Sequence, residues 1–375
     1  MKQLVVIFTL WLAWMPVGAQ KTLTLEECLK LGIENNLSLE GSRNEMRKAK
    51  HLLSENRAKL WPQISAVAGF NDNFNPPVSV TDGSAYGNLY NVTKTLQYNA
   101  SAGLQLQMPL YNQTVYTAVD IARTLNELNR LSYEKAREDL MMQISKMYYL
   151  GQNTMEQLTL IQENMVRLRE LRDITLAFFD NGMAMEVDVK RVNINLENQQ
   201  VQYDNAKSML VQQLNLLKYV MDYPADEEIT LTPVDTERIQ LASLTGLRGD
   251  LYELQLLQSQ EKLAGQQKDL IRQGYLPSLT LTGSWMYSAY TDKARHWFHS
   301  GPSNHWYPST GLGITLRVPI FDGFDKRARI RKAQIDQENA RLNYENTLKN
   351  MQTQYLNATN ELMNNQRNFK KQKDY

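Results

Sequence analysis

The sequence has a single cysteine, Cys28, and a formal net charge of only +1 over 375 residues. One cysteine cannot form an internal disulfide, so the chain is not a small disulfide-stabilised scaffold. We expect Cys28 to be a small packing residue on a helix face. A charge near zero gives no electrostatic reason to expect nucleic acid or another acidic partner.

The sequence also lacks the motifs that mark enzymes. It contains no phosphate-binding loop, nucleophile elbow or metalloprotease signature. His296, His299 and His305 fall in one segment, but no carboxylate or cysteine spacing completes a metal site. Trp297 and Trp306 lie among these histidines, so a folded aromatic loop is the simpler interpretation. We therefore expect no catalytic activity, no cofactor and no metal.

Long apolar runs are missing after residue 19. Before it, Lys2, an apolar run from Leu4 to Met15 and the small residues Val17-Gly18-Ala19 predict a secretory signal peptide over residues 1–19. A membrane-anchoring helix is the alternative, but the run is shorter than the ~20 residues that a bilayer requires. The mature chain is expected to begin near Gln20 and to enter a second membrane only through strands.

Residues 277–320 predict a pair of strands joined by a long polar loop. Leu279, Leu281, Trp285 and Tyr287 alternate with Thr280, Thr282 and Ser284, and Leu312, Ile314, Leu316 and Val318 alternate with Gly311, Gly313, Thr315 and Arg317. This period of two is a strand pattern with one apolar face. Pro277 and Pro319 bound the pair, and the ladder is expected to end at both.

A fainter copy of the same unit lies upstream, over residues 62–110. Ile64, Ala66, Ala68 and Phe70 form one alternating run, and Leu104, Leu106 and Met108 alternate with Gln105 and Gln107. Pro62 and Pro109 occupy the positions of Pro277 and Pro319. Met108-Pro-Leu-Tyr-Asn112 corresponds to Val318-Pro-Ile-Phe-Asp322, so each copy is expected to read helix, strand, loop, strand, helix.

Helices are expected on both sides of each strand pair. They span residues 20–61, 111–220, 250–276 and 321–375, and a linker over residues 221–249 joins the copies. No proline or glycine occurs from Asn112 to Leu150, which predicts a rod of ~60 Å. Apolar residues at spacings of three and four continue along it, which indicates coiled-coil packing. The pair Asn181-Gly182 is predicted to form a tight helical hairpin.

Four strands are too few to close a membrane barrel, because the smallest bacterial barrels have about eight. Chains are therefore expected to pool their strands. Aromatic residues at both ends of the strands are typical of the girdles at membrane–water interfaces; they are Trp61, Tyr111, Tyr275 and Phe321 at the proline end, and Phe70, Tyr98, Trp285 and Tyr287 at the other. The edge of a soluble β-sandwich is the alternative.

The motifs and their duplication resemble those of the TolC-like outer-membrane efflux proteins, the outer membrane factors. The resemblance extends over nearly all of the mature chain. The matching stretches are Leu23-Thr-Leu-Glu-Glu-Cys28 with Asn35-Asn36, Asn181-Gly-Met183 with Asp188-Val189, Arg248-Gly-Asp-Leu251, Leu276-Pro-Ser-Leu279 and Val318-Pro-Ile-Phe-Asp-Gly323. Gly249 stands where the family usually has proline.

The resemblance implies a mixed α and β membrane protein of the outer membrane with a periplasmic extension. Three chains would each contribute four strands to one shared barrel, and their helices would continue as a coiled-coil tunnel. A periplasmic adaptor protein and an inner-membrane efflux pump are the implied partners, besides outer-membrane lipid. Residues implied to contact the adaptor lie at the hairpin tip; they are Phe179, Asn181, Gly182, Met183 and Met185.

A polar lumen would keep a continuous water path through such a barrel. The residues expected to face it are Gln105, Gln107, Thr280, Thr282, Thr315 and Arg317. Arg317 is the only charge on the alternating faces of these strands, and it is interpreted equally as part of a ring of positive charge or as one half of an ion pair. The basic run Lys326–Lys332 is interpreted as a solvated helix face, with a lipid-headgroup site as the alternative.

The expected function is that of the exit duct of a tripartite efflux pump for small molecules. A conduit for type I protein secretion and a soluble periplasmic coiled-coil scaffold are the alternatives. The sequence does not identify the exported substrate. The chain ends before a second counterpart of Gly182 is reached, so we expect the second helical hairpin to be missing and the tube to be leaky or poorly coupled to its adaptor.

Overall fold

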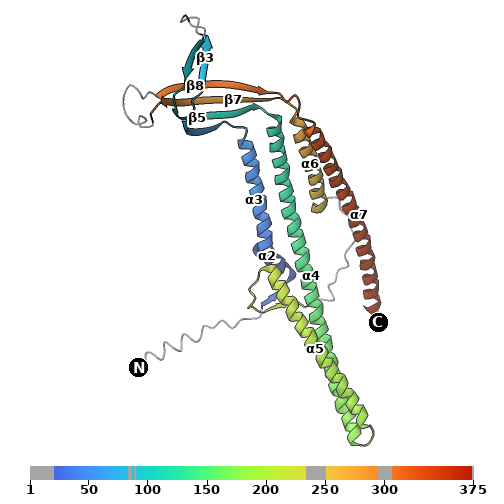
Figure 1. Cartoon of the computed structure of the whole chain (residues 1–375). Helices are drawn as coiled ribbons and strands as arrows, with labels where there is room; N and C mark the ends of the chain where they lie inside the picture. The colour runs from blue at the N-terminus through green and yellow to red at the C-terminus, as the bar shows by residue number, and fades with distance from the viewer. Residues whose placement is uncertain (1–20, 83–86, 88–89, 234–250, 294–305, 374–375) are drawn as a thin grey trace, which may run out of the picture. The chain divides into compact units, whose positions relative to one another are not determined.

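A computed structural model describes residues 21–82, 87, 90–233, 251–293 and 306–373 (Figure 1). The expected signal peptide, Gly249 and the three loop histidines lie outside the described residues. The chain divides into two compact units. Unit 1 comprises Met1–Met46, Asn129–Glu253 and Asn350–Tyr375, and unit 2 comprises Arg47–Leu128 and Leu254–Lys349. The predicted combination of long helices with four strands is confirmed.

Unit 2 contains an antiparallel sheet with the strand order β2-β5-β7-β8. Its strands are β2 (Gln63–Asp72), β5 (Tyr98–Tyr111), β7 (Ser278–Thr291) and β8 (Trp306–Arg317). The sheet places β5 of the first copy beside β7 of the second. A separate hairpin of β3 (Val78–Asp82) and β4 (Tyr90–Lys94), absent from the sequence-based prediction, lies between β2 and β5 in the chain.

Pro109 does not end its strand, which corrects the prediction for this residue. β5 continues to Tyr111, and its pairing with β7 changes register between Pro109 and Tyr111. The ladder between β5 and β2 ends earlier, at the pair Gln107–Gln63. At Pro109, strand β5 therefore pairs on one side only, and a bulge follows. An edge position and a bulge are the two places where a strand tolerates a residue without an N–H group.

The first of the expected helical ranges holds two helices rather than one. The helices are α2 (Leu25–Asn35), α3 (Leu37–Ala58), α4 (Gln113–Asp180), α5 (Glu186–Met221), α6 (Tyr252–Gln273) and α7 (Asp325–Lys373). Helix α4 has 68 residues, which makes it ~100 Å long. None of the helices in the described ranges is long and apolar enough to cross a bilayer.

The single helix expected over residues 20–61 is divided at Asn36. The side chain of Asn36 accepts a hydrogen bond of 2.9 Å from the N–H of Leu39, as an N-cap residue does. Its amide Nδ2 donates to the carbonyl oxygen of Val220 at 2.8 Å. Thr24 caps α2 in a reciprocal capping box with Glu27. Each helix therefore has its own start signal, and a capped break replaces one continuous rod.

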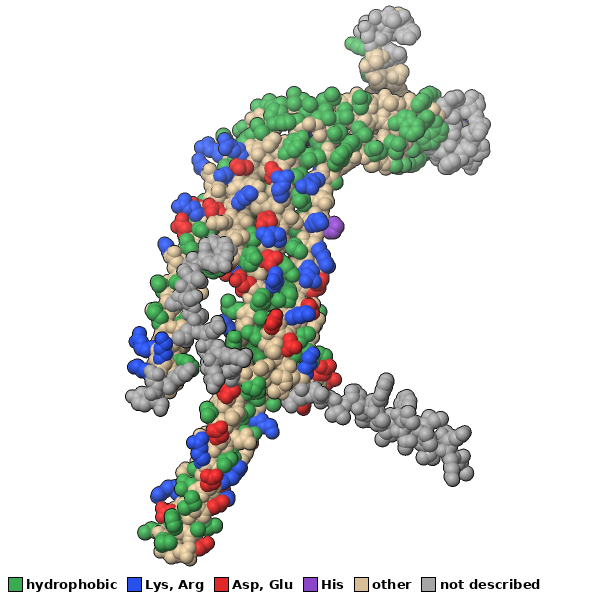
Figure 2. Space-filling model, turned by 180° about the vertical axis from the view of Figure 1, so that it is seen from behind, with side chains coloured by type: hydrophobic (Ala, Val, Ile, Leu, Met, Phe, Trp, Pro, Cys, Tyr) green, Lys and Arg blue, Asp and Glu red, His purple; other side chains and the backbone are tan. Residues whose placement is uncertain are grey.

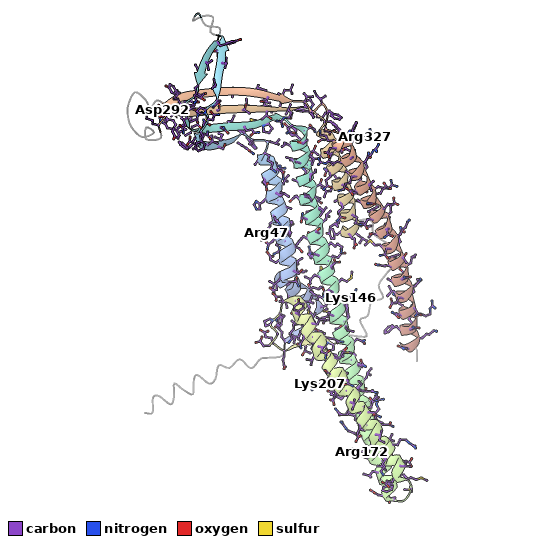
Figure 3. All side chains as sticks on the ribbon, in the orientation of Figure 1. Arg47, Lys146, Arg172, Lys207, Asp292 and Arg327 are labelled. Carbon is purple, nitrogen blue, oxygen red and sulfur yellow. The ribbon has the colours of Figure 1, made fainter. Side chains whose placement is uncertain are left out.

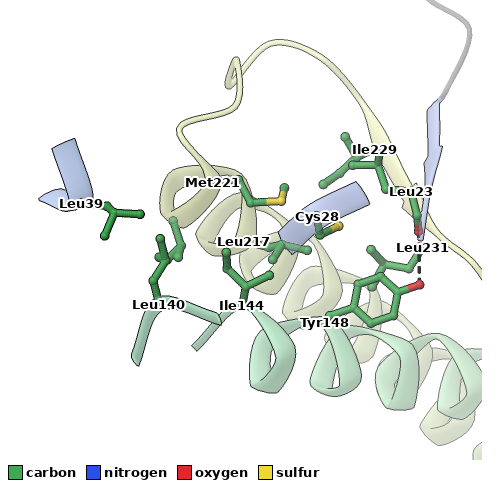
Figure 4. Close-up of a cluster of buried hydrophobic side chains, with 11 residues drawn as sticks. Leu23, Cys28, Leu39, Leu140, Ile144, Tyr148, Leu217, Met221, Ile229 and Leu231 are labelled. Atoms are coloured by element: carbon green, nitrogen blue, oxygen red, sulfur yellow. Dashed lines mark hydrogen bonds between the residues drawn. The ribbon is translucent and has the colours of Figure 1, made fainter. Parts of the chain in front are cut away.

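The core of unit 1 packs α2, α4 and α5 against a short parallel pair of strands (Figure 4). Strand β1 (Lys21–Leu23) pairs with β6 (Ile229–Leu231), inside the segment predicted to be only a linker. The fully buried side chains include Leu23, Cys28, Ile144, Leu217, Met221 and Leu231. Tyr148 donates its hydroxyl hydrogen bond to the carbonyl oxygen of Leu23 at 3.2 Å. The start of the described chain is thus held in the core rather than left as a free tail.

Candidate functional site: a two-faced sheet and a helical hairpin tip

One face of the sheet in unit 2 is polar across all four strands. Gln107 pairs with Gln63 on one side and Thr282 on the other, and Thr282 pairs with Gly313. The next row on this face joins Ser65, Gln105, Ser284 and Gly311. Successive residues of a strand point to opposite faces, so rows two residues apart share a face.

All six residues predicted to face a lumen lie on this polar face. Thr280 pairs with Thr315, and Arg317 pairs with Ser278 at the end of β7. Gln105, Gln107 and Thr282 belong to the two rows already described. Arg317 is exposed and makes no ion pair with any residue that the structure describes. The register therefore brings the six together on one face of the sheet.

The opposite face is apolar and open. Leu104 pairs with Trp285, and Leu281 pairs with Ile314. Leu312 is 78% exposed, and the large apolar side chains follow the sheet in Figure 2. An apolar surface that extends over a whole sheet exceeds what a soluble monomer leaves in water, so it marks contact with a membrane or with another protein.

The two ends of the strands carry the aromatic residues predicted for them. At the proline end, Trp61, Tyr111, Tyr275 and Phe321 are all exposed. At the other end, Phe70 stacks on Tyr98 with ring centroids 6.2 Å apart, and Trp285 meets Tyr287 edge to face at 5.6 Å. Pro62, Pro277 and Pro319 lie just outside β2, β7 and β8.

The helical hairpin of unit 1 ends in a turn whose conformation favours glycine. Gly182 has a φ of +77°, which residues with a side chain rarely adopt. The N–H of Met183 donates to the carbonyl oxygen of Phe178 at 2.8 Å, and that of Gly182 donates to Phe179 at 2.9 Å. This pair of bonds is a Schellman motif, which satisfies the last carbonyls of α4 and turns the chain sharply into α5.

The side chains at this turn are apolar and exposed. Phe179, Met183 and Met185 all project into solvent, and Met185 is 72% exposed. Further from the turn, Ile161 and Met165 of α4 pack against Ala206 of α5, with Leu158, Leu196 and Tyr203 around them. The pair of helices is therefore held by its own small core, while its tip presents uncovered apolar groups.

Two helix caps were not identified from the sequence, although the duplication contains the signal for both. Asp322 accepts hydrogen bonds from the N–H groups of Phe324 at 3.1 Å and Lys326 at 3.2 Å. Its counterpart Asn112 accepts from the N–H of Thr114 at 3.1 Å. Asn112 is thus the N-cap of α4, whereas Asp322 lies three residues before α7 and accepts from an N–H group of its first turn.

Electrostatics also fixes the first turn of α7. The Nζ of Lys326 lies 3.1 Å from Asp322 and 5.1 Å from the centre of the Tyr275 ring. Desolvation alone would raise the pKa of Asp322, but the hydrogen bonds and charge of Lys326 outweigh it and lower the pKa. Asp322 is thus held in its charged form, the form that caps the helix.

No group of three metal-binding side chains occurs in the part of the chain that the structure describes.

A sheet with one polar and one apolar face, joined to very long helices, is the architecture of an outer-membrane channel with a helical tunnel. Comparisons with known proteins give the same class. The family model for outer membrane efflux proteins matches residues 29–221 and 251–374.

Individual relatives agree with the family match. The chain is 23% identical to the outer membrane protein TolC of Vibrio cholerae over 83% of its own length and 68% of that protein. It is 22% identical to a probable efflux pump outer membrane protein, TtgC of Pseudomonas putida, over 86% of its length and 65% of the relative. A crystal structure of CusC matches with a TM-score of 0.70 at 16% identity, covering 87% of this chain and 72% of that one.

This chain belongs to the outer membrane efflux protein family. It is an outer-membrane protein, and its family is one of channels rather than of enzymes. The chain spans about two thirds of the length of the two curated relatives.

Proposed function

We propose that this protein is the exit duct of a tripartite efflux pump, through which small molecules leave the periplasmic side of the cell for the outside. The observation that carries the proposal is the two-faced sheet, polar on one side and apolar on the other in all four strands. A barrel wall has lipid on one side and water on the other, which accounts for an apolar face that stays exposed in one chain as well as for the polar face.

A single chain cannot complete that wall. β2 and β8 are the edge strands of the sheet, and every residue of β8 is exposed. Unpaired backbone groups cannot remain in hydrocarbon, so β8 of one chain must pair with β2 of the next. We propose that three chains close the barrel in this way, as the family resemblance implies.

Helix α7 supports contact between chains. Ile335, Leu342, Leu356 and Met363 recur at intervals of seven residues or fourteen, and all four side chains are exposed. A seven-residue apolar repeat is the pattern of a coiled-coil seam. Within the described residues this seam is uncovered, so we propose that helices of a neighbouring chain pack on it and continue the barrel as a tunnel.

In the assembled channel, the polar face would line the lumen. Gln105, Gln107, Thr280, Thr282 and Thr315 would supply uncharged hydrogen-bonding groups to water. Three copies of Arg317 would form a ring of positive charge close to the helical end of the barrel. Of the two interpretations of Arg317, the absence of an ion pair within the described part of the chain favours the ring.

The hairpin tip would be the contact with the periplasmic adaptor, which in turn joins the inner-membrane pump. Phe179, Asn181, Gly182, Met183 and Met185 form this tip. Exposed methionine side chains are adaptable apolar contacts, and the glycine turn sets the direction in which they project. A type I secretion conduit would use the same tip, so the identity of the copurifying inner-membrane transporter distinguishes the two functions. A soluble scaffold would have no use for the open apolar sheet face.

Deletion of the gene in its native host tests the proposal. The deletion strain is expected to accumulate an amphipathic fluorescent dye in energised cells to a level several-fold above the parent. Return of the native gene to the deletion strain should restore the lower level. Equal dye accumulation in the parent and the deletion strain, in a host without a second efflux duct, would contradict the proposal.

A further inference from the structure

The apolar face of β8 continues beyond the strand. Leu312, Ile314 and Leu316 are exposed along the strand, and Val318 and Ile320 extend the apolar surface past Pro319. Ile320 is 95% exposed. The apolar surface therefore does not end with the sheet but reaches the first turn of α7.

An aromatic pair stands at the end of this surface. Phe321 and Phe324 meet edge to face, with ring centroids 5.5 Å apart, and both are exposed. Phe324 adopts a left-handed φ of +69°, a conformation that is costly for an aromatic residue. The turn thus retains a strained backbone and places an apolar ring in solvent, an arrangement that stability alone does not favour.

Two arginines follow the aromatic pair on the same side of α7. Phe324, Arg327, Ala328 and Arg331 line one shallow pocket. Arg327 lies where the chain passes from the sheet into α7 (Figure 3), and cations gather at this helix start in Figure 2. Arg327 and Arg331 are one helical turn apart, and like charges at this spacing repel each other. The arrangement therefore favours an anion between them.

The neighbouring cations already have partners. Lys326 lies 3.1 Å from Asp322, and Arg329 lies 3.6 Å from Asp325. Among the residues that the structure describes, Arg327 and Arg331 make no ion pair. The two guanidinium groups beside the apolar surface are thus free to bind an external anion, and guanidinium groups match the oxygens of a phosphate.

We propose that this pocket binds a glycerophospholipid of the periplasmic leaflet, with its phosphate held between Arg327 and Arg331. The acyl chains would lie along Ile320 and the exposed face of β8. The order of apolar strand, aromatic pair and cations reproduces the order of layers that a protein surface meets on leaving a bilayer. This inference rests on the proposed function, since it requires the sheet to be in the outer membrane.

Arg327 and Arg331 lie on the same face of α7 as the seam proposed for a neighbouring chain, but they precede Ile335, its first residue. At this start of the helix, the charge and the continuity of the surface favour lipid over a second copy of the chain. A neighbouring chain would have to present an acid to the arginines and also cover the isoleucine and both rings. A phospholipid has both parts in one molecule, an anionic head and an apolar tail. Contact with another copy remains as a defined outcome of the test.

The test is native mass spectrometry of the full chain in detergent, titrated with phosphatidylglycerol. The variant R327Q/R331Q removes both charges from the pocket. The matched control is R367Q/K371Q, which removes two exposed cations at the same spacing from the far end of α7. Diacylglycerol with the same acyl chains tests whether the phosphate is required.

We expect R327Q/R331Q to bind phosphatidylglycerol about ten-fold more weakly than the unmodified protein, because charge-assisted contacts to phosphate are lost. The control should bind as the unmodified protein does, and diacylglycerol should bind weakly to all three. Equal phosphatidylglycerol binding by both double variants would overturn the proposal. So would a change in oligomeric state of R327Q/R331Q without a change in lipid affinity, which would identify a contact between copies.

Fractionation of the same cells separates this proposal from the proposed function. If the unmodified protein is found outside the outer membrane, the proposed function fails. If the unmodified protein is in the outer membrane and R327Q/R331Q retains its lipid, only the phospholipid site fails.

Discussion

The amide Nδ2 of Asn36 donates a hydrogen bond of 2.8 Å to the carbonyl oxygen of Val220, a residue 184 positions further along the chain. The same side chain caps α3 through the N–H of Leu39. One residue therefore both divides the first helical run and fastens it to the end of α5, next to the core of unit 1.

Replacing Asn36 with aspartate is expected to separate these two roles. Aspartate keeps the acceptor for Leu39 but removes the donor and places a carboxylate against a carbonyl oxygen. We expect Asn36→Asp to lower the free energy of unfolding of unit 1 by about 1–3 kcal/mol, measured by urea denaturation. Asn56→Asp is the control, because Asn56 makes its bond to Leu52 in an exposed position. A larger loss in the control than in Asn36→Asp would contradict the role assigned to Asn36.

Gly103 is expected to tolerate no side chain. A Cβ atom at this position would lie 2.2 Å from the carbonyl oxygen of Trp285 and 2.7 Å from the Cα of Met286, so it would force β5 away from β7. We expect Gly103→Ala to cost about 1–3 kcal/mol and to lower the amount of folded protein in the membrane. Gly69→Ala is the matched control, since its Cβ would make only an ordinary contact of 3.5 Å with Ser101. The measurement is the fraction of heat-modifiable, folded protein on a gel, and equal fractions for the two variants would refute the prediction.

Cys28 is expected to report the opening of the core of unit 1. Burial, with a smaller contribution from Glu27, raises the pKa of its thiol to about 11. Only about one thiol in a thousand is then ionised at pH 8, and the ionised form is the nucleophile. We expect no labelling of the native protein by iodoacetamide at pH 8, and complete labelling in guanidinium chloride. Rapid labelling of the native protein would show that the helix α2 is not packed as described.

Gly182→Val is expected to weaken binding of the adaptor without loss of membrane insertion. Valine is β-branched and resists the left-handed φ of +77° that the turn requires, so the exposed side chains beside it would be displaced. Gly182→Asn is the matched variant, because asparagine tolerates this conformation far better. Crosslinking to the adaptor should fall several-fold for valine and little for asparagine. Unchanged crosslinking of both variants would show that the hairpin tip does not contact the adaptor.

The two faces of the sheet could be predicted from the sequence because a period of two assigns every residue of a strand to a face. The weaker β2 and β5 were underestimated in length, since Ala100, Ser101 and Ala102 give little contrast between alternate positions. Pro109 was predicted to end its strand because proline lacks an N–H group. The strand continues past it because β5 there pairs with β7 and no longer with β2, and the sequence of one strand does not show which neighbours it pairs with.

Other features depended on contacts distant in sequence. β1 and β6 have three residues each, which is too few for a periodic pattern. Each forms a strand only because it pairs with the other. In the long helices, apolar spacing indicated a seam but not its partner. Met142 fits the apolar spacing along α4, yet it is exposed while Leu140 and Ile144 are buried. Leu171 and Ile174, near the tip, are exposed as well. Apolar residues at helical spacing include those that pack against other chains. The spacing therefore predicts more buried residues than the core of a single chain contains.

In the proposed channel, the polar face of the sheet meets water inside the outer membrane while the opposite face meets lipid. The most direct measurement is the reactivity of single cysteines with a hydrophilic maleimide in intact outer membranes, in a Cys28→Ala background. Gln107→Cys and Thr282→Cys represent the polar face, and their neighbours Leu106→Cys and Leu281→Cys represent the apolar face. We expect rapid labelling of the first pair and at least about ten-fold slower labelling of the second, because a hydrophilic reagent does not enter hydrocarbon. Equal labelling of both pairs, or faster labelling of the leucine positions, would contradict this arrangement.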